Sequence, residues 1–343
     1  MCGIVGHVGS GYSADILIEG LKRLEYRGYD SSGIAVLDNG QIAMDKAVGK
    51  LQNLITSLEG NALSGSIGIG HTRWATHGGV THANAHPHKS ADDAVIVHNG
   101  IIENFRELRA ELQASGHIFT SDTDSEVVSH LCVELAKSYD EPAALLRALL
   151  ERLEGSYALC ILMRAFDDCL LVARNASPLA IGIGEDACFV ASDAMAMSEQ
   201  TRRMIYLKDN DYAVVRQDGA VIYDANHQLV NREEVIVAAN PGLVSKGGYR
   251  HFMEKEIHEQ PDAIAHTLSA MTDDKGALTA GLSDDDLQKI NGIVFLAAGT
   301  SHYAGLVGRY WIEKLAGVPV TVEVASEYRY RAPVTAHLTH AIA

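Results

Sequence analysis

The sequence predicts an α+β layered domain, followed by a connecting segment and the opening of an α/β unit. Over residues 2–223, short strands joined by hairpin turns are mixed with clusters of helices, which is typical of packed α and β layers and not of repeated βαβ units. Residues 224–284 begin as a polar, weakly periodic stretch with Gly and Pro, and predict a linker and a helical connection. Residues 285–343 contain an apolar strand, a Gly-Thr-Ser turn and a helix, which is the order of a βα unit.

The composition is that of an ordinary globular protein. The chain has 343 residues, of which 47% are hydrophobic and 21% are charged, so it is long enough for about two domains with their own cores. A formal net charge of −16 argues against nonspecific binding of nucleic acid or of an anionic membrane. A local positive pocket for an anionic small molecule remains compatible with that charge.

The five cysteines form no CxxC pair, and an odd number without a spacing pattern fits a reducing compartment. Cys160, Cys169 and Cys188 lie in apolar runs and are predicted to be buried as small hydrophobic residues. The first residues lack the basic flank and apolar stretch of a signal peptide, and no run approaches the ~18 apolar residues of a membrane span. We therefore expect a cytoplasmic location and no membrane partner.

The chain opens with a predicted strand at residues 3–9, an apolar run whose glycines permit close approach of neighbouring backbone. A helix is expected to begin at Ser13 as its N-cap and to end near Gly28, because apolar residues recur at helical spacing between them. Residues 38–40, Asp-Asn-Gly, are a hairpin signal. The other elements predicted in this part are strands at 34–37, 41–48 and 66–71 and a helix at 50–58.

Cys2 stands directly after the initiator methionine, so that removal of Met1 makes it the N-terminal residue. It then carries a thiol with an ordinary pKa of about 8.5 beside a free α-amino group with a pKa of about 8. Such an amine can act as general base for the nucleophile of its own residue, which no internal residue can do. The alternative, from these residues alone, is that Cys2 is an incidental second residue.

Residues 71–79, with the sequence HTRWATHGG, have neither a helical nor a strand period. They predict a loop that closes over a ligand or binds it. Arg73 has the geometry to bind a carboxylate through two hydrogen bonds, and a surface salt bridge is its alternative. Trp74 is predicted to lie on the surface of this loop, and burial in a hydrophobic core is its alternative.

Histidines are frequent in residues 82–88 and raise the question of a metal site. His82, His86 and His88 have no acidic or cysteine ligand set at zinc spacing, and Pro87 interrupts any helical face. We therefore expect no metal in this protein.

A strand predicted at 94–98 ends in Asn99-Gly100. The Asn99 side-chain amide and the Gly100 backbone N–H are candidate oxyanion donors, and a plain Asn-Gly turn is the alternative. The residues that follow do not resemble a returning hairpin strand, and they lead into a helix predicted at 104–115.

Asp124 opens the next helix, predicted at about 124–138. Capping explains one acid at such a position, and a further acid remains for a ligand ammonium group. For Asp124 both alternatives stay open. Ser192 and Asp193 are predicted to cap a short helix. The remaining elements predicted in this domain are a helix at 142–153 and strands near 156–163, 168–173, 179–184, 187–191, 203–207, 211–216 and 220–223.

The last part of the chain contains a predicted helical region from Tyr249, a buried strand at 292–296 and a helix that ends near Ala316. Thr300 and Ser301 lie in the turn between that strand and that helix. Free helix N–H groups beside two hydroxyls form a suitable phosphate site, and simple capping of the helix is the alternative. A second strand is predicted at 318–324.

Several ordered motifs closely resemble class II glutamine amidotransferases, the N-terminal-nucleophile type. Further motifs look like the family of glutamine–fructose-6-phosphate aminotransferases, and the resemblance covers essentially the whole chain. The first set is CGIVG at 2–6, LEYRGYDS at 24–31, HTRWATHG at 71–78, HNGIIEN at 98–104 and Thr123-Asp124. The second set is YRHFM at 249–253, KEI at 255–257, EQP at 259–261, GTS at 299–301 and SEYRYR at 326–331.

This resemblance implies a four-layer αββα N-terminal-nucleophile hydrolase domain, followed by the first part of an αβα sugar-isomerase (SIS) domain. It also implies a role for each matching residue. Cys2 would attack the side-chain amide of glutamine, with Asn99 and Gly100 as oxyanion donors. The glutamine pocket would be formed by Arg73 for the α-carboxylate, Asp124 for the α-ammonium, Thr76, His77, the loop residue Trp74 and the nearby Arg27, and the sugar phosphate would be held by Thr300 and Ser301.

The resemblance also implies the substrates L-glutamine and fructose 6-phosphate, no cofactor, and a homodimer at full length. The sequence carries only the opening of the first SIS subdomain, without the later phosphate loop and the acid/base residues of the second. We therefore expect this polypeptide alone to hydrolyse glutamine and not to form glucosamine 6-phosphate.

Two other interpretations compete for the same residues. Other class II amidotransferases would show an acidic pyrophosphate loop after a strand, or a Ser-Gly-Gly nucleotide loop, and neither occurs in 224–343. A non-catalytic regulatory or sugar-phosphate-sensing protein with this fold would be expected to have lost its nucleophile or its oxyanion donors, and both are present in the sequence.

Overall fold

The computed structural model describes residues 2–75, 78–237, 249–272, 284–331 and 340–342. The chain divides into two compact units, Met1–Phe252 and Met253–Ala343. Thr76 and His77, two residues singled out in the sequence, lie outside the described residues.

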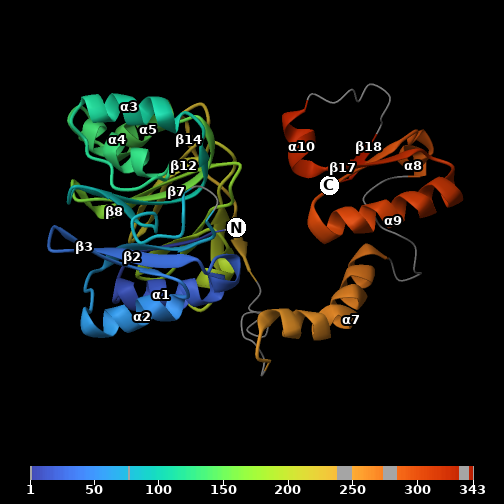
Figure 1. The fold of residues 1–343 in the computed structure, drawn as a ribbon, viewed down its shortest axis with the longest axis horizontal. Helices are drawn as coiled ribbons and strands as arrows, with labels where there is room; N and C mark the ends of the chain where they lie inside the picture. The colour runs from blue at the N-terminus through green and yellow to red at the C-terminus, as the bar shows by residue number, and fades with distance from the viewer. Residues whose placement is uncertain (1, 76–77, 238–248, 273–283, 332–339, 343) are drawn as a thin grey trace. The chain divides into compact units, whose positions relative to one another are not determined.

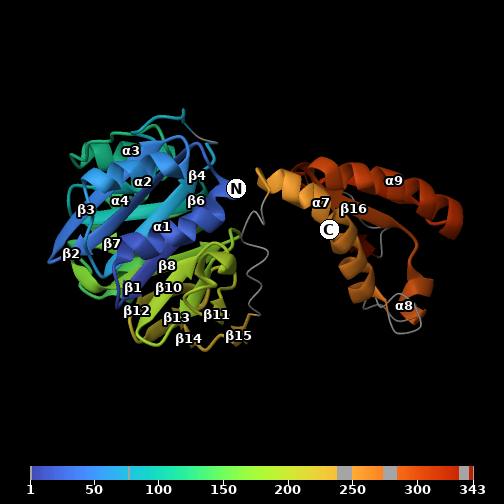
Figure 2. The same ribbon diagram turned by 90° about the horizontal axis from the view of Figure 1, so that it is seen from below.

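The first unit is built of four layers, with helices on the outside and two sheets between them. In Figure 1, helices α3, α4 and α5 cover one sheet, and α1 and α2 cover the other. Figure 2 shows α1 and α2 in front of the sheet that contains β1 and β4. The predicted αββα architecture is therefore confirmed. The helices are α1 (Ser13–Leu24), α2 (Leu51–Gly60), α3 (Phe105–Ala114), α4 (Glu126–Ala136) and α5 (Pro142–Leu150), with short 3-10 turns η1 (Glu25–Arg27) and η2 (Ala194–Met197).

The first sheet has eight strands in the order β15-β11-β9-β10-β1-β4-β2-β3, and its neighbouring strands are antiparallel. β1, the start of the chain, therefore lies in the middle of the sheet. Its strands are β1 (Gly3–Gly9), β2 (Ser31–Asp38), β3 (Gln41–Val48), β4 (Ile67–Arg73), β9 (Ala180–Ile183), β10 (Ala187–Ala191), β11 (Arg203–Tyr206) and β15 (Glu234–Ile236).

The second sheet has seven antiparallel strands in the order β14-β13-β12-β8-β7-β6-β5. Its longest pairing joins β6 to β7, from Ala94 opposite Met163 to Ile102 opposite Gly155. Its strands are β5 (His88–Ser90), β6 (Ala94–Ile102), β7 (Gly155–Met163), β8 (Phe166–Asn175), β12 (Tyr212–Arg216), β13 (Gly219–Tyr223) and β14 (Leu229–Val230).

Three apolar cores fill the spaces between the four layers. Successive residues of a strand point to opposite faces of its sheet, so one strand contributes to two cores. In β6, Ile96 packs toward helices α3–α5, whereas Val95 and Val97 face the other sheet. In β2, Ile34 packs toward α1 and α2, whereas Ala35 faces the second sheet. Because the cores share strands, a shift of one layer disturbs its neighbours.

The structure corrects three local predictions. β6 does not end before Asn99-Gly100 but continues through them to Ile102, because β7 pairs along its whole length. Ser13 is not the N-cap of α1: Tyr12 occupies that position, and the Ser13 hydroxyl lies 2.8 Å from Nδ1 of the buried His7. The stretch expected to be a linker contributes two edge strands, β14 and β15.

Other local predictions are confirmed. Asp193 accepts a hydrogen bond from the backbone N–H of Met195 at 3.0 Å and caps η2. Cys160, Cys169 and Cys188 are buried.

The second unit contains a three-stranded parallel sheet in the order β17-β16-β18, in agreement with the predicted α/β class. Helix α9 packs closely on it, since a Cβ on Gly305 would lie 3.1 Å from Val322 and 3.3 Å from Phe295. Within the described residues, no helix combines the length and the apolar character needed to cross a membrane. The elements are α7 (Phe252–Met271), α8 (Asp284–Lys289), β16 (Ile293–Ala297), α9 (Gly299–Ala316), β17 (Val320–Val324), α10 (Ala325–Tyr330) and β18 (His340–Ile342).

Gly155, at the start of β7, tests how tightly the β6–β7 pairing is packed. Its φ is +120°, and a Cβ there would lie 2.2 Å from the backbone O of Ile101. Gly116 is a matched control, because its φ is +93° and a Cβ there would have no neighbouring atom within 4 Å. Gly116→Ala is expected to cost about 1 kcal/mol from the left-handed backbone alone. Gly155→Ala is expected to cost more than about 3 kcal/mol, since the clash adds to that strain. Urea unfolding followed by circular dichroism measures both, and equal losses would contradict the packing described.

Candidate active site

The site lies where the ends of β1 and β4 in one sheet meet β6 of the other. Antiparallel pairing places Thr72 opposite Gly3 and so brings Arg73 opposite Cys2. Asn99 of β6 donates from Nδ2 to the backbone O of Cys2 at 3.0 Å and joins the two sheets. A cavity of about 310 Å³ opens at this point. Its lining includes these residues predicted from the sequence: Cys2, Arg27, Arg73, Trp74, Asn99, Gly100 and Asp124.

Cys2 is half-buried at the edge of the cavity, and its sulfur contacts the backbone of Trp74. The Trp74 N–H donates to Sγ at 3.2 Å, and Sγ lies 3.5 Å from the Trp74 carbonyl oxygen. Burial raises the pKa of the Cys2 thiol. The Trp74 N–H and the positive charge of Arg73 lower that pKa, but the effect of burial is larger. The thiolate is the nucleophilic form of cysteine, so a reaction at Cys2 needs a base to take this proton.

The Asn99 amide is held in one orientation by the buried His71. His71 Nε2 lies 2.9 Å from Asn99 Oδ1 and 3.1 Å from the backbone O of His98. Both partners are acceptors, so Nε2 carries the proton. Burial lowers the pKa of His71 to about 3, which keeps the ring neutral with this single N–H. Asn99 Nδ2 is thereby turned toward Cys2, and one of its two N–H groups serves the bond to Cys2 O.

Gly100 follows Asn99 within β6 and has a φ of +127°, in the left-handed region that favours glycine. A Cβ there would lie 2.0 Å from the backbone O of Ser156 on β7. The Asn-Gly pair is thus part of a strand, and not the plain turn that was the alternative in the sequence. Asn99 and Gly100 line the same cavity as Cys2, which keeps them as candidate donors for a developing oxyanion.

Arg73 and Asp124 place opposite charges in the same cavity. Arg73 is only 3% exposed, so it is not a surface residue, and it donates from Nη1 to Gly79 O at 3.1 Å and from Nη2 to Gly78 O at 3.3 Å. Asp124 is 4% exposed, and its Oδ2 accepts from the Ile102 N–H at 2.7 Å. Helix α4 begins at Glu126 with Ser125 as N-cap, so Asp124 does not cap it. A buried cation and a buried anion on one cavity suit a zwitterionic ligand.

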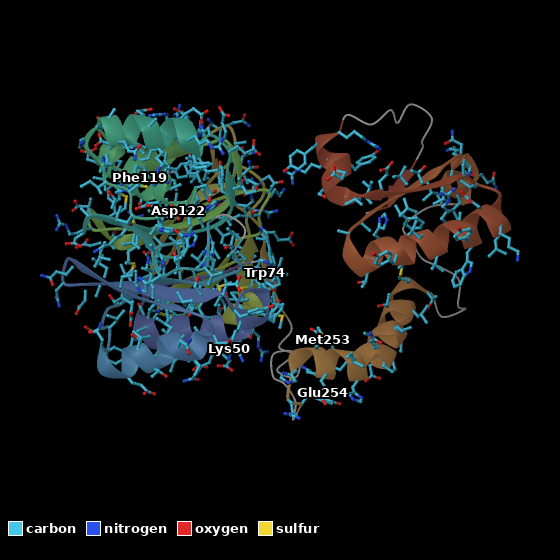
Figure 3. All side chains as sticks on the ribbon, in the orientation of Figure 1. Lys50, Trp74, Phe119, Asp122, Met253 and Glu254 are labelled. Carbon is cyan, nitrogen blue, oxygen red and sulfur yellow. The ribbon has the colours of Figure 1, made fainter. Side chains whose placement is uncertain are left out.

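Arg27 and Trp74 lie at the rim. Arg27 forms an ion pair with Asp193 and donates from Nε to the Tyr26 hydroxyl at 2.8 Å. Trp74, labelled in Figure 3, is 43% exposed and meets the ring of Tyr29 edge-on at 5.4 Å, so it is not a core anchor.

Sequence reasoning missed a group of buried histidines beside the site. His86 stacks on His71 with ring centroids 4.3 Å apart and meets His88 edge-on at 4.4 Å. His98 Nδ1 lies 2.8 Å from the Ser125 hydroxyl. Burial lowers the pKa of His86 and His98, and lowers that of His88 to about 3, so all are neutral. The signal in the sequence was the histidine-rich run, which is explained by this packing.

Thr300 and Ser301 lie in the second unit, in the first turn of α9, and both are exposed. The N-cap of α9 is Ala298, and no side chain caps it, so helix capping does not account for these hydroxyls.

Among the described residues, no group of three or more His, Cys, Asp or Glu side chains is arranged to hold a metal ion.

Comparisons with known proteins agree with this fold and site. The glutamine amidotransferase domain family matches residues 71–199, which include Arg73, Asn99 and Asp124. Glutamine phosphoribosylpyrophosphate amidotransferase from B. subtilis has a similar fold, with a TM-score of 0.59 and 19% identity over 98% of this chain and 69% of that one. The domain match identifies a glutamine amidotransferase domain, and the fold is of the N-terminal-nucleophile type.

Closer relatives by sequence narrow this class. Glutamine–fructose-6-phosphate aminotransferase of Mesorhizobium japonicum is 49% identical over 96% of this chain and 54% of its own length. The enzyme of the same name from Zymomonas mobilis is 47% identical over 97% of this chain and 55% of its own length. The chain belongs to the family of glutamine–fructose-6-phosphate aminotransferases, and it spans about half the length of the curated relatives it matches.

The five cysteines are expected to differ sharply in reactivity. Cys2 is half-buried, whereas the other four are buried. Burial raises the pKa of Cys132 and Cys169 to about 12 and that of Cys188 to about 11. Iodoacetamide at about pH 8 is therefore expected to label Cys2 alone in the folded protein. Intact-mass spectrometry with peptide mapping measures this, and a guanidinium-unfolded sample should take five labels. A second label on folded protein would contradict the burial described.

The buried neutral histidines are expected to make the protein sensitive to mild acid. Burial lowers the pKa of His7 to about 4 and that of His71 to about 3, against 6.5 as the ordinary value. Below 6.5 the unfolded chain binds protons that the folded chain does not, so stability falls as the pH falls from 6.5 toward these values, by about 1.4 kcal/mol per pH unit for each such histidine. Urea unfolding at about pH 7 and pH 5 tests this. His7→Gln should show a shallower fall, and equal wild-type stability at both pH values would contradict it.

Proposed function

We propose that this chain hydrolyses the side-chain amide of L-glutamine, with Cys2 as nucleophile. The observation that supports the proposal most directly is the shared cavity: it brings a cysteine thiol, an Asn-Gly donor pair and two buried opposite charges together. These are the groups that an amide of a zwitterionic amino acid requires.

The reaction begins with removal of Met1, which frees the α-amine of Cys2. That amine accepts the thiol proton while Sγ bonds to the amide carbon of glutamine, and burial of the thiol makes such a base necessary. The amide oxygen becomes an oxyanion, to which the second N–H of Asn99 Nδ2 and the backbone N–H of Gly100 donate.

Collapse of this tetrahedral intermediate breaks the carbon–nitrogen bond. The protonated amine of Cys2 returns its proton to the leaving nitrogen, which departs as ammonia, and a γ-glutamyl thioester remains on Sγ. Water then attacks the thioester carbon while the amine takes the proton from water. Glutamate leaves, and the thiol of Cys2 is restored.

Recognition of glutamine is assigned to the charged residues of the cavity. The Arg73 guanidinium binds the α-carboxylate and Asp124 binds the α-ammonium, since each is buried and of opposite charge to its ligand group. By the family resemblance, Thr76 and His77 complete the pocket, Arg27 lies near the nucleophile and Trp74 belongs to the segment that closes over the ligand.

In the whole protein we propose that the ammonia aminates fructose 6-phosphate to give glucosamine 6-phosphate, the reaction that the family name implies. Thr300 and Ser301 would bind the sugar phosphate at the start of α9. We further propose that the full-length protein is a homodimer. The net charge of −16 favours no nucleic-acid or membrane partner. The five free cysteines favour the cytoplasm, where thiols stay reduced. A purely regulatory protein with this fold is less well supported, because the described lining of the cavity keeps both the nucleophile and the oxyanion donors.

The test is glutamate release from glutamine by the purified 343-residue chain, with Met1 removal checked by intact mass. Wild type is expected to form glutamate, and Cys2→Ala is expected to lose at least about a thousandfold in rate because no thioester can form. Because the chain spans about half of its relatives, fructose 6-phosphate is expected to leave the rate unchanged and to yield no amino sugar.

Two results would overturn this proposal. Glutamate formed equally by Cys2→Ala would place the nucleophile elsewhere. No glutamate from wild type with Met1 removed would show that the chain does not act as a glutaminase on its own. Stimulation by fructose 6-phosphate would instead contradict only the expectation for the sugar site.

A further inference from the structure

Asn84 is a buried polar residue in the segment between β4 and β5, and it ties two separate segments together. Its side chain is 1% exposed. Nδ2 donates to the backbone O of Gly79 at 3.1 Å, and Oδ1 accepts from the backbone N–H of Asp122 at 2.9 Å. Nδ2 also lies 3.4 Å from Asp122 Oδ2. Asp122, labelled in Figure 3, belongs to the segment that leads into α4.

The first of these segments binds the guanidinium of Arg73, the last residue of β4. The same Gly79 carbonyl that accepts from Asn84 also accepts from Arg73 Nη1 at 3.1 Å, and the Gly78 carbonyl accepts from Nη2 at 3.3 Å. Gly78 has a φ of +75°, and a Cβ there would lie 2.8 Å from Asn84 Nδ2. Asn84 therefore bonds to one of the two carbonyl groups that orient the guanidinium and packs beside Gly78, the residue that carries the other.

The second segment holds Asp124, two residues after Asp122. The backbone N–H of Asp122 donates to Asn84, that of Ser121 donates to Glu126 at 2.7 Å, and the side chain of Thr123 lies 3.0 Å from His88 Nε2. Asp124 itself uses Oδ2 for the Ile102 N–H. Apart from that bond, the position of the Asp124 carboxylate depends on the same backbone that Asn84 holds.

We propose that Asn84 is a positioning residue that sets the separation between the Arg73 guanidinium and the Asp124 carboxylate, and so selects a free α-amino acid. A single amide group bonds to the backbone of both segments, so a shift of one segment relative to the other breaks a hydrogen bond of Asn84. An α-carboxylate and an α-ammonium on one carbon stand at a fixed spacing, and a clamp held at that spacing favours free glutamine over a glutamine residue within a peptide. This inference rests on the proposed function.

Asn84 does not hold the reacting atoms. Cys2 and Asn99 are positioned by β1 and β6, by the Asn99–Cys2 bond and by His71. Loss of Asn84 is therefore expected to weaken binding of groups on the α-carbon and to leave the reactivity of the thiol unchanged.

The experiment compares two reagents that alkylate Cys2. The chloroketone analogue of glutamine carries the α-carboxylate and α-ammonium, whereas iodoacetamide carries neither. Asn84→Ala is expected to lower the second-order rate of inactivation by the chloroketone about tenfold, for the loss of one or two hydrogen bonds in the clamp. Iodoacetamide should label Cys2 at the wild-type rate. With glutamine, KM should rise by about the same factor while kcat stays within about twofold.

Asn104→Ala is the matched control. Asn104 likewise donates from Nδ2 to a backbone O, that of Arg152 at 2.9 Å, and accepts at Oδ1 from a backbone N–H, that of Glu154 at 3.1 Å. It does not line the cavity. Asn104→Ala is expected to lose stability as Asn84→Ala does, and to keep the wild-type KM and chloroketone rate.

Three outcomes separate the inference from the proposed function. Wild type that neither reacts with the chloroketone nor hydrolyses glutamine overturns the proposed function. Active wild type with an unchanged Asn84→Ala variant overturns the role of Asn84 alone. Equal loss of both alkylation rates, or the same rise in KM for Asn104→Ala, shows a general structural role and also overturns it. Asn84→Asp gives a variant of the same shape, and it should show the same KM effect because it has no N–H for Gly79.

Discussion

The hydrogen bond from Asn99 Nδ2 to the backbone oxygen of Cys2 is the contact on which the site depends. It joins the start of β1, in the middle of the eight-stranded sheet, to β6 in the facing sheet. The apolar core between the sheets, with Ile4 from one side and Val97 from the other, fixes this approach. A nucleophile at a chain end is inherently mobile, and here the end is held by a central strand and by a side chain of the opposite layer.

Burial controls the electrostatics around this contact. The histidines beside the cavity are neutral because burial lowers their pKa values, so His98 does not pair with Asp124 as a cation near pH 7. Among the described lining residues, Asp124, Arg73 and the Asp193-paired Arg27 are then the charged groups of the cavity. Neutrality also fixes the tautomer of His71, and through it the orientation of the Asn99 amide. The same desolvation that makes these histidines a liability in acid makes them useful for alignment at neutral pH.

The residues alone predicted most helices and strands, because apolar runs in strands such as β6 and helical spacing in α1 are local signals, whereas the four-layer order came from the family resemblance. Motifs likewise identified the residues that line the cavity. The sequence did not reveal that β6 runs through Asn99-Gly100, since that depends on pairing with β7, far along the chain. Nor did it reveal the contacts of His71 and Asn84, because they join segments that are distant in sequence and follow no period. Ser13 was misassigned because its hydroxyl pairs with the buried ring of His7, a side-chain contact that a capping signal does not reveal.

The site therefore combines two kinds of support. Strands hold Cys2, Asn99 and Gly100, where small errors in position affect the bond that is made and broken. Arg73 is the last residue of β4, and its guanidinium is oriented by the carbonyls of Gly78 and Gly79 in the segment that follows. Asp124 lies outside the strands, in a segment held by buried polar side chains. A segment outside the strands has no ladder of hydrogen bonds to hold it. A buried amide such as Asn84 supplies part of that support, because it bonds to two segments at once. The guanidinium of Arg73 and the carboxylate of Asp124 thus depend on buried polar contacts that the strand ladder alone does not supply.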